Sequence, residues 1–116
     1  MDLSIVIPVY NSARIVPELT RRIANAMSGF QGVREYEVIL VNDGSADVSW
    51  EAIEHACEQY STFRGIDLRK NAVQHNAIMA GIRHATGDVI VVMDDDLQHA
   101  PEDIGKLYVK VREGCD

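Results

Sequence analysis

Short apolar runs alternate with longer amphipathic segments along the whole chain. Four runs are rich in Val, Ile and Leu and predict buried β-strands; they lie at 3–9, 36–41, 63–68 and 89–93. The segments after them mix apolar and polar residues at helical spacing; they lie at 13–27, 47–60, 72–85 and from Pro101 onward. Strands that alternate with helices are typical of an α/β fold, here a mainly parallel sheet with helices on both faces.

Local signals predict where several helices begin and how one of them packs. We expect Asn11 or Ser12 to cap the first helix and Asp47 to cap the second, because short polar side chains satisfy the first amides of a helix. In the third helix, Ala77 and Gly81 form a small-residue face that permits close packing. Pro101 suits the first position of the last helix.

Polar residues gather where three of the predicted strands end. Tyr10 and Asn11 follow the first strand, residues 42–45 (NDGS) follow the second, and residues 94–98 (DDDLQ) follow the fourth. In parallel α/β sheets, ligands bind outside the carboxyl ends of the strands. The three clusters therefore predict a single binding site at one edge of the sheet.

Three consecutive aspartates at the end of a buried strand would repel one another unless a cation offsets their charge. In an extended segment, Asp94 and Asp96 share one face and Asp95 points elsewhere. Two carboxylates on one face suit Mg²⁺ or Mn²⁺, and Gln98 adds an amide oxygen one further step along. The alternative is a solvated acidic turn before a helix.

Other residues near the same edge suit a nucleotide. A Tyr10 ring at a strand end can stack on a flat base. Asp43 can accept a hydrogen bond from a base or ribose, although residues 42–47 also have the composition of a turn and helix cap. Arg69 and Lys70 precede the third helix and can meet phosphate, or remain solvated surface charges.

Composition narrows the classes of function. The 116 residues carry a formal net charge of −7 without a basic stripe, so we expect no nucleic-acid partner. Such a chain would bind anions through a metal ion.

The two cysteines lack the spacing of a zinc site, and the sequence contains no GxGxxG, P-loop or GxSxG motif. The apolar runs are too short to span a membrane, and we expect a cytoplasmic protein with reduced thiols.

Taken together, the motifs carry a family resemblance. The segments SIVIPVYN (4–11), EVILVNDGSAD (37–47) and 69–104 (RKNAVQHN to PEDI) resemble the family-2 glycosyltransferases of the GT-A fold. The match covers nearly the whole chain in the right order. The DxDLQ form followed by HxPE is most similar to the polyprenyl-phosphate sugar transferases, which act on dolichol or undecaprenyl phosphate.

The resemblance implies roles for particular residues. The nucleotide-binding positions would be Pro8, Val9, Tyr10, Asn11, Asp43, Lys70, Asp94 and Asp95. The metal and the donor diphosphate would be held by the DxD pair, Asp94 and Asp96, which activates the donor, with Gln98 beside it. Two positions depart from the family pattern: Val73 replaces a common Gly, and Asp95 replaces a common small residue.

The resemblance also implies the reaction. An inverting transferase would move a sugar from a UDP- or GDP-linked donor to an acceptor, here a polyprenyl phosphate. Only the N-terminal, nucleotide-binding half of a GT-A domain is matched, so we expect residues 1–116 to be truncated. The acceptor pocket and any base would then lie beyond Asp116, with any contact to the cytoplasmic membrane face. Alone, the chain would bind donor weakly and transfer poorly or not at all.

Two other classes fit the alternating pattern and the acidic cluster less well. A signalling receiver domain has the right length, but it places an acidic pair after its first strand, where this chain has Pro8 to Asn11. A phosphatase of the DxD type also needs its nucleophilic aspartate there. Formation of a stable aspartyl-phosphate from acetyl phosphate would favour the receiver.

Overall fold

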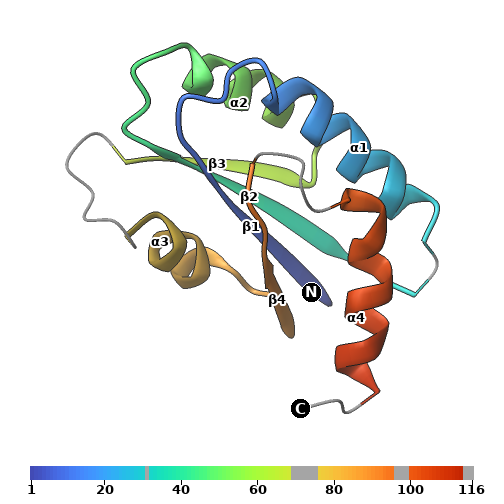
Figure 1. Ribbon diagram of the computed structural model, residues 1–116. Coiled ribbons are helices and arrows are strands. Elements are labelled where there is room, and N and C mark those ends of the chain that lie inside the picture. The colour runs from blue at the N-terminus through green and yellow to red at the C-terminus, as the bar shows by residue number, and fades with distance from the viewer. Residues whose placement is uncertain (31, 69–75, 96–99, 114–116) are drawn as a thin grey trace.

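A parallel four-stranded sheet organises the protein (Figure 1). The computed structural model describes residues 1–30, 32–68, 76–95 and 100–113. The sheet has the order β3-β2-β1-β4, with strands β1 (Leu3–Val9), β2 (Tyr36–Asp43), β3 (Phe63–Leu68) and β4 (Val89–Val92). The helices are α1 (Val16–Ser28), α2 (Ser49–Gln59), α3 (Asn76–His84) and α4 (Ile104–Arg112). The predicted alternation of strands and helices is confirmed.

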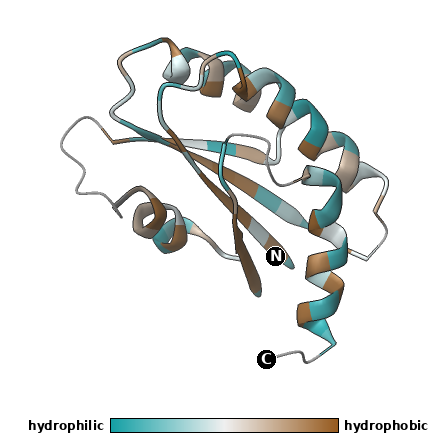
Figure 2. Ribbon diagram, in the orientation of Figure 1, coloured by the Kyte–Doolittle hydropathy of each residue, from teal (hydrophilic) through white to brown (hydrophobic). Residues whose placement is uncertain are grey.

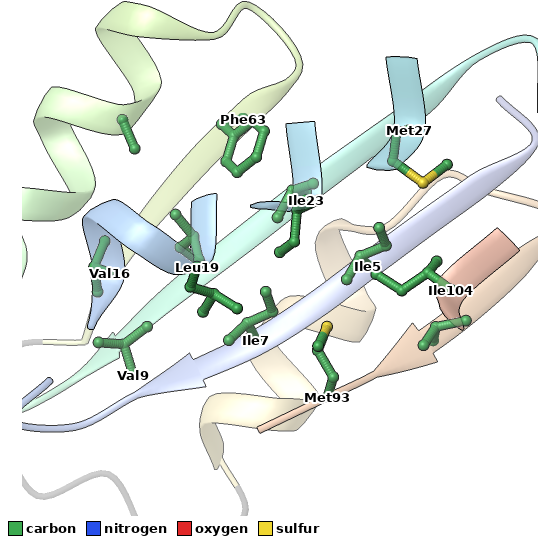
Figure 3. Packing of buried hydrophobic residues seen from close by; sticks show 14 of the residues in the cluster. Ile5, Ile7, Val9, Val16, Leu19, Ile23, Met27, Phe63, Met93 and Ile104 are labelled. Carbon is green, nitrogen blue, oxygen red and sulfur yellow. The ribbon is translucent and has the colours of Figure 1, made fainter. Parts of the chain in front are cut away.

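Helices cover both faces of the sheet, as predicted. Helices α1, α2 and α4 share one apolar cluster with the sheet, whereas α3 packs on the opposite face (Figure 1). In Figure 3, Ile5 and Ile7 of β1 lie against Leu19 and Ile23 of α1. Figure 2 shows β1 as largely hydrophobic, while α1 mixes both kinds of residue. An amphipathic helix over a continuous apolar strand produces this pattern.

The position of a strand in the sheet decides how deeply it is buried. Strand β1 lies between β2 and β4, and its Val6 and Ile7, which point to opposite faces, are both fully buried. Strand β4 lies at an edge of the described sheet, and Ile90 and Val92 are 39% and 43% exposed. The expectation of a fully buried fourth strand is therefore wrong for one of its faces, because α3 packs on β1 and β2 instead.

The small-residue face of α3 is the face that meets the sheet. Ala77 is buried against Ile39 and Val41. A Cβ atom on Gly81 would lie 2.3 Å from Cγ1 of Val6, so a side chain at this position would push the helix away from β1. The predicted close packing is confirmed, and only a glycine permits this distance.

Two expected helix starts are wrong. Helix α1 begins at Val16 after a turn, with Ile15 as its N-cap residue and no capping side chain. Ser12 contributes its carbonyl oxygen, which accepts bonds from Ile15 and Val16. Pro101 opens a short 3₁₀ turn, Pro101–Asp103, and α4 begins only at Ile104. Among the described residues, no helix is long and apolar enough to cross a membrane.

A buried carboxylate joins the amino ends of three strands. Glu37 of β2 is 3% exposed and accepts hydrogen bonds from Ser4 Oγ (2.6 Å), Thr86 N (2.7 Å) and Arg64 Nη1 (2.9 Å). Burial alone would raise the pKa of Glu37, but these hydrogen bonds outweigh it and hold the pKa below its ordinary value of 4.5. This role of Glu37 was not predicted from the sequence.

Substitution of Glu37 by Gln is expected to destabilise the fold in a pH-dependent manner. The pKa of Glu37 is lowered by folding, so its contribution is present above the unfolded pKa and disappears as the pH falls through the folded pKa. At pH 7 we expect Glu37→Gln to lower the free energy of unfolding by about 2 kcal/mol. Urea unfolding of both proteins from pH 7 down to pH 3 measures the difference, which should shrink below pH 4.5.

Glu35→Gln provides the matched control. The Glu35 side chain is 74% exposed and makes one ion pair of 4.0 Å with the amino terminus, so its loss should change the free energy of unfolding by less than about 0.5 kcal/mol. A Glu37→Gln effect that stays constant down to pH 3 would show that the carboxylate charge is not what stabilises the cluster.

Candidate functional site: the carboxyl edge of the sheet

Three loops meet where the strands end. The register pairs Val9 with Asn42 and Asp43 with Leu68, so β1, β2 and β3 finish almost level. We call residues 10–13 the β1 turn, residues 44–48 the β2 loop and residues 93–95 the β4 loop. The convergence predicted from the polar clusters is found in the structure, because hydrogen bonds join the β1 turn to both other loops.

Four successive amides of the β1 turn donate to side chains from elsewhere in the chain. Each acceptor is an oxygen atom that lies at least 34 positions away in sequence. The bonds run from Tyr10 N to Asp95 Oδ2 (3.2 Å), Asn11 N to Ser45 Oγ (2.9 Å), Ser12 N to Ser49 Oγ (2.9 Å) and Ala13 N to Asp47 Oδ2 (3.2 Å). The turn therefore takes its conformation from its neighbours.

Asn11 holds the centre of the β1 turn. Its φ of 50° lies in the left-handed region, which Asn tolerates better than most residues. Its Oδ1 atom accepts a hydrogen bond of 2.7 Å from the backbone N–H of Ala46 in the β2 loop. The side chain that we expected either to cap α1 or to line a ribose pocket thus joins two loops.

Asp47 and Ser49 anchor the β2 loop at the start of α2. Asp47 Oδ1 accepts hydrogen bonds from both the hydroxyl (2.5 Å) and the backbone N–H (2.9 Å) of Ser49. The Ser49 hydroxyl bond, aided by the Ala13 amide, lowers the pKa of Asp47 below its ordinary value. Asp47 therefore bonds the first residue of α2, close to its expected role, although Val48 occupies the N-cap position.

Other polar groups at this edge remain accessible. The Tyr10 side chain is 62% exposed, Asp94 is exposed and Asp43 is half-buried. Asn42 is only 5% exposed and donates from Nδ2 to Asp67 Oδ1 (3.0 Å). Its Oδ1 has no hydrogen-bond partner in the described part of the chain. The edge therefore presents an aromatic ring and two carboxylates at the ends of the strands.

The remaining predicted site residues fall into two groups. Val9 is fully buried in the core, so only its backbone faces the edge, and Pro8 is half-buried beside it. Lys70, Asp96 and Gln98 lie outside the described residues, as does Val73. The hydrogen bonds of Ser45 and Ser49 to the β1 turn were not predicted from the sequence, although Ser45 belongs to the polar cluster after the second strand. The only sequence signal for them is that serines follow the second strand.

The described part of the site fits a divalent cation that arrives with a phosphorylated ligand. Asp94 offers an exposed carboxylate two residues after the end of β4, and none of the hydrogen bonds between described residues involves it. No group of three His, Cys, Asp or Glu side chains among these residues could hold a metal ion by itself. Mg²⁺ commonly takes only one or two protein carboxylates and completes its shell with phosphate and water.

Comparison with known families defines the class of protein. The model of glycosyl transferase family 2 matches residues 4–116, and the chain belongs to this family. A curated relative from Enterobacter sp. (strain 638), an undecaprenyl-phosphate 4-deoxy-4-formamido-L-arabinose transferase, is 46% identical over 115 residues. The match covers 98% of this chain and 35% of the relative, so the chain spans about a third of that protein. This family assignment replaces the receiver and phosphatase alternatives.

Solved structures confirm the GT-A fold. The mannosyltransferase PcManGT from Pyrobaculum calidifontis, in complex with GDP-Man and Mn²⁺, superposes with a TM-score of 0.77 at 23% identity, covering 98% of this chain and 32% of the other. TarS from S. aureus gives a TM-score of 0.71 at 19% identity and covers 97% and 33%. At these identities the likeness establishes the fold alone.

Variants at position 11 separate the contribution of the left-handed backbone conformation from that of the hydrogen bond to Ala46. We expect Asn11→Ala to lower the free energy of unfolding by about 2 kcal/mol, because alanine strains at a positive φ and loses the bond to Ala46. Asn11→Gly loses only the bond and should be about 1 kcal/mol more stable than Asn11→Ala. Urea unfolding at pH 7 measures both.

Asn11→Asp is the control, since it keeps an oxygen for the Ala46 amide. It should unfold within about 0.5 kcal/mol of the original protein. Equal losses in Asn11→Ala and Asn11→Gly would show that the left-handed conformation contributes nothing to the choice of residue.

Proposed function

We propose that the carboxyl edge of the sheet is the donor site of an inverting glycosyltransferase. The donor is a sugar nucleotide with UDP or GDP, and the acceptor is a polyprenyl phosphate. The observation that supports the proposal is the hydrogen bonding of the β1 turn to both the β2 loop and the β4 loop, which brings together the strand ends that carry Tyr10, Asp43 and Asp94. These side chains offer a stacking surface, a hydrogen-bond acceptor and a metal ligand within one site.

Each described residue has a distinct task in this proposal. Tyr10 stacks on the base, and Asp43 accepts a hydrogen bond from the base or ribose. Asp94 and, by sequence, Asp96 and Gln98 hold Mg²⁺ or Mn²⁺. When bound, the cation neutralises charge that develops on the departing nucleoside diphosphate. A chain with a net charge of −7 has particular need of a cation to bind this anion.

The reaction itself exchanges one bond for another. The bond between the anomeric carbon and the donor phosphate oxygen breaks, and the nucleoside diphosphate leaves with its electron pair. A phosphate oxygen of the acceptor attacks the opposite face of the sugar, so the configuration inverts. The acceptor is already anionic and needs little help from a general base.

The names of the relatives support this choice. The Enterobacter relative is named for transfer to undecaprenyl phosphate. Among the proteins of like fold, PcManGT was solved with GDP-Man and Mn²⁺, and TarS with UDP-GlcNAc. The two donors differ in base, so they leave open whether this chain prefers UDP or GDP.

Calorimetric titration with UDP and GDP, each with and without Mn²⁺, tests the donor site. We expect one nucleotide to bind in a Mn²⁺-dependent manner. Asp94→Asn and Asp96→Asn should each weaken binding at least about tenfold, which corresponds to 1.4 kcal/mol. The matched control is Asp88→Asn, because Asp88 is also exposed but lies at the amino end of β4.

Each alternative outcome contradicts a different part of the proposal. Binding that is equal with and without Mn²⁺ would contradict the metal role of the DxD pair. Failure of both nucleotides to bind would contradict a donor site in this chain. A longer chain, extended past Asp116, would then show whether the site needs further residues or whether the assignment of the edge is wrong.

A further inference from the structure

The middle aspartate of the DDD motif differs from its neighbour in its surroundings. Asp94 is exposed, whereas Asp95 is half-buried. Asp95 Oδ2 accepts the backbone N–H of Tyr10 (3.2 Å) and lies 2.5 Å from Oγ of Ser12. Three adjacent carboxylates therefore do not form one metal-binding group, because the second is directed toward the β1 turn.

The hydrogen bond between Asp95 and Tyr10 lies beyond the last backbone hydrogen bond between β1 and β4. The register of β1 with β4 ends at Val6 and Val92, and the final backbone bond runs from Met93 N to Val6 O (3.1 Å). Past that point, no backbone hydrogen bond between described residues joins the segment after β1 to the segment after β4. The Asp95 carboxylate reconnects them four residues past Val6, at Tyr10 of the β1 turn.

Ser12 extends this connection to the other side of the site. The Ser12 hydroxyl faces both Asp95 Oδ2 and the carbonyl oxygen of Tyr10 (2.9 Å), and its backbone N–H donates to Ser49 Oγ at the start of α2. A continuous chain of hydrogen bonds thus runs from the β4 loop through the β1 turn to α2. The bond from Ser12 N to Ser49 is buried, whereas the contacts of the Ser12 hydroxyl are partly buried.

We propose that Asp95 is a positioning residue that fixes the β1 turn, and with it Tyr10, against the metal-binding loop. Asp95 acts through the turn and is neither a third metal ligand nor a direct contact of the nucleotide. This inference rests on the proposed function for the meaning of the site. It departs from the family-based assignment of Asp95 to the nucleotide-binding residues.

Substitutions distinguish an acceptor from a metal ligand. Asp95→Asn keeps an oxygen for the Tyr10 amide but removes the charge, while Asp95→Ala removes both. If Asp95 is a positioning acceptor, Asp95→Asn should change turn exchange and nucleotide binding mildly, and Asp95→Ala should change them strongly. If Asp95 is a metal ligand, Asp95→Asn should weaken metal-dependent nucleotide binding nearly as much as Asp95→Ala. The same is expected of Asn and Ala at Asp94.

The first readout needs no ligand. Amide hydrogen exchange of the β1 turn should be about tenfold faster in Asp95→Ala than in the original chain, because the turn loses its link to the β4 loop. Ser12→Ala should give a similar increase, and the double variant should add little to either single one. Asp88→Ala, at the opposite edge, should leave exchange at residues 10–13 unchanged.

The second readout is the titration with UDP or GDP. Asp95→Ala should weaken nucleotide binding about tenfold while the Mn²⁺ concentration for half-maximal effect stays the same. Asp95→Asn should bind within about threefold of the original chain, because it preserves the acceptor.

Two results would overturn the inference. One is unchanged exchange of the β1 turn in Asp95→Ala, and the other is a loss of Mn²⁺ affinity in Asp95→Asn as large as that in Asp94→Asn. The exchange measurement also separates this inference from the proposed function. If no nucleotide binds but the turn is loosened by Asp95→Ala, the positioning role stands and the donor-site proposal fails.

Discussion

The structure depends on one constraint: backbone N–H groups need hydrogen-bond acceptors where parallel strands end. Each strand of a parallel sheet leaves its ladder at the same edge, and the amides that follow it must be satisfied by other groups. Here side chains from the β2 loop, the β4 loop and the start of α2 accept hydrogen bonds from the four backbone N–H groups of the β1 turn. This requirement brings the polar residues together at the edge where we propose the ligand site.

Polar residues at the carboxyl edge consequently divide into two kinds. Ser45, Ser49 and Asp47 are engaged with backbone groups and shape the loops. Tyr10 and Asp94 project from that scaffold with their functional groups accessible. At the amino edge, Glu37 is also structural, because its bonds connect β2 to Ser4 of β1, to Arg64 of β3 and to Thr86 in the loop before β4.

The fold was predictable because hydrophobic periodicity is a local property of the sequence. Continuous apolar runs such as Leu3–Val9 are typical of strands buried between two helical layers, and the rule for strand ends then predicts where a ligand would bind. Pairings between distant residues were not predictable. Nothing in the sequence distinguishes Ser12 as a helix cap from Ser12 as a partner of Asp95, because both roles need only a hydroxyl after a strand.

The dependence of the β1 turn on distant partners also bears on the order of folding. Its four amides bond to residues 34, 34, 37 and 85 positions away, so contacts of long sequence separation must form before the turn can settle. A partly folded chain that had paired β1 with β2 but not yet with β4 would lack Asp95 at Tyr10. Any ligand that recognises the settled turn would therefore bind only after the last described strand is in place.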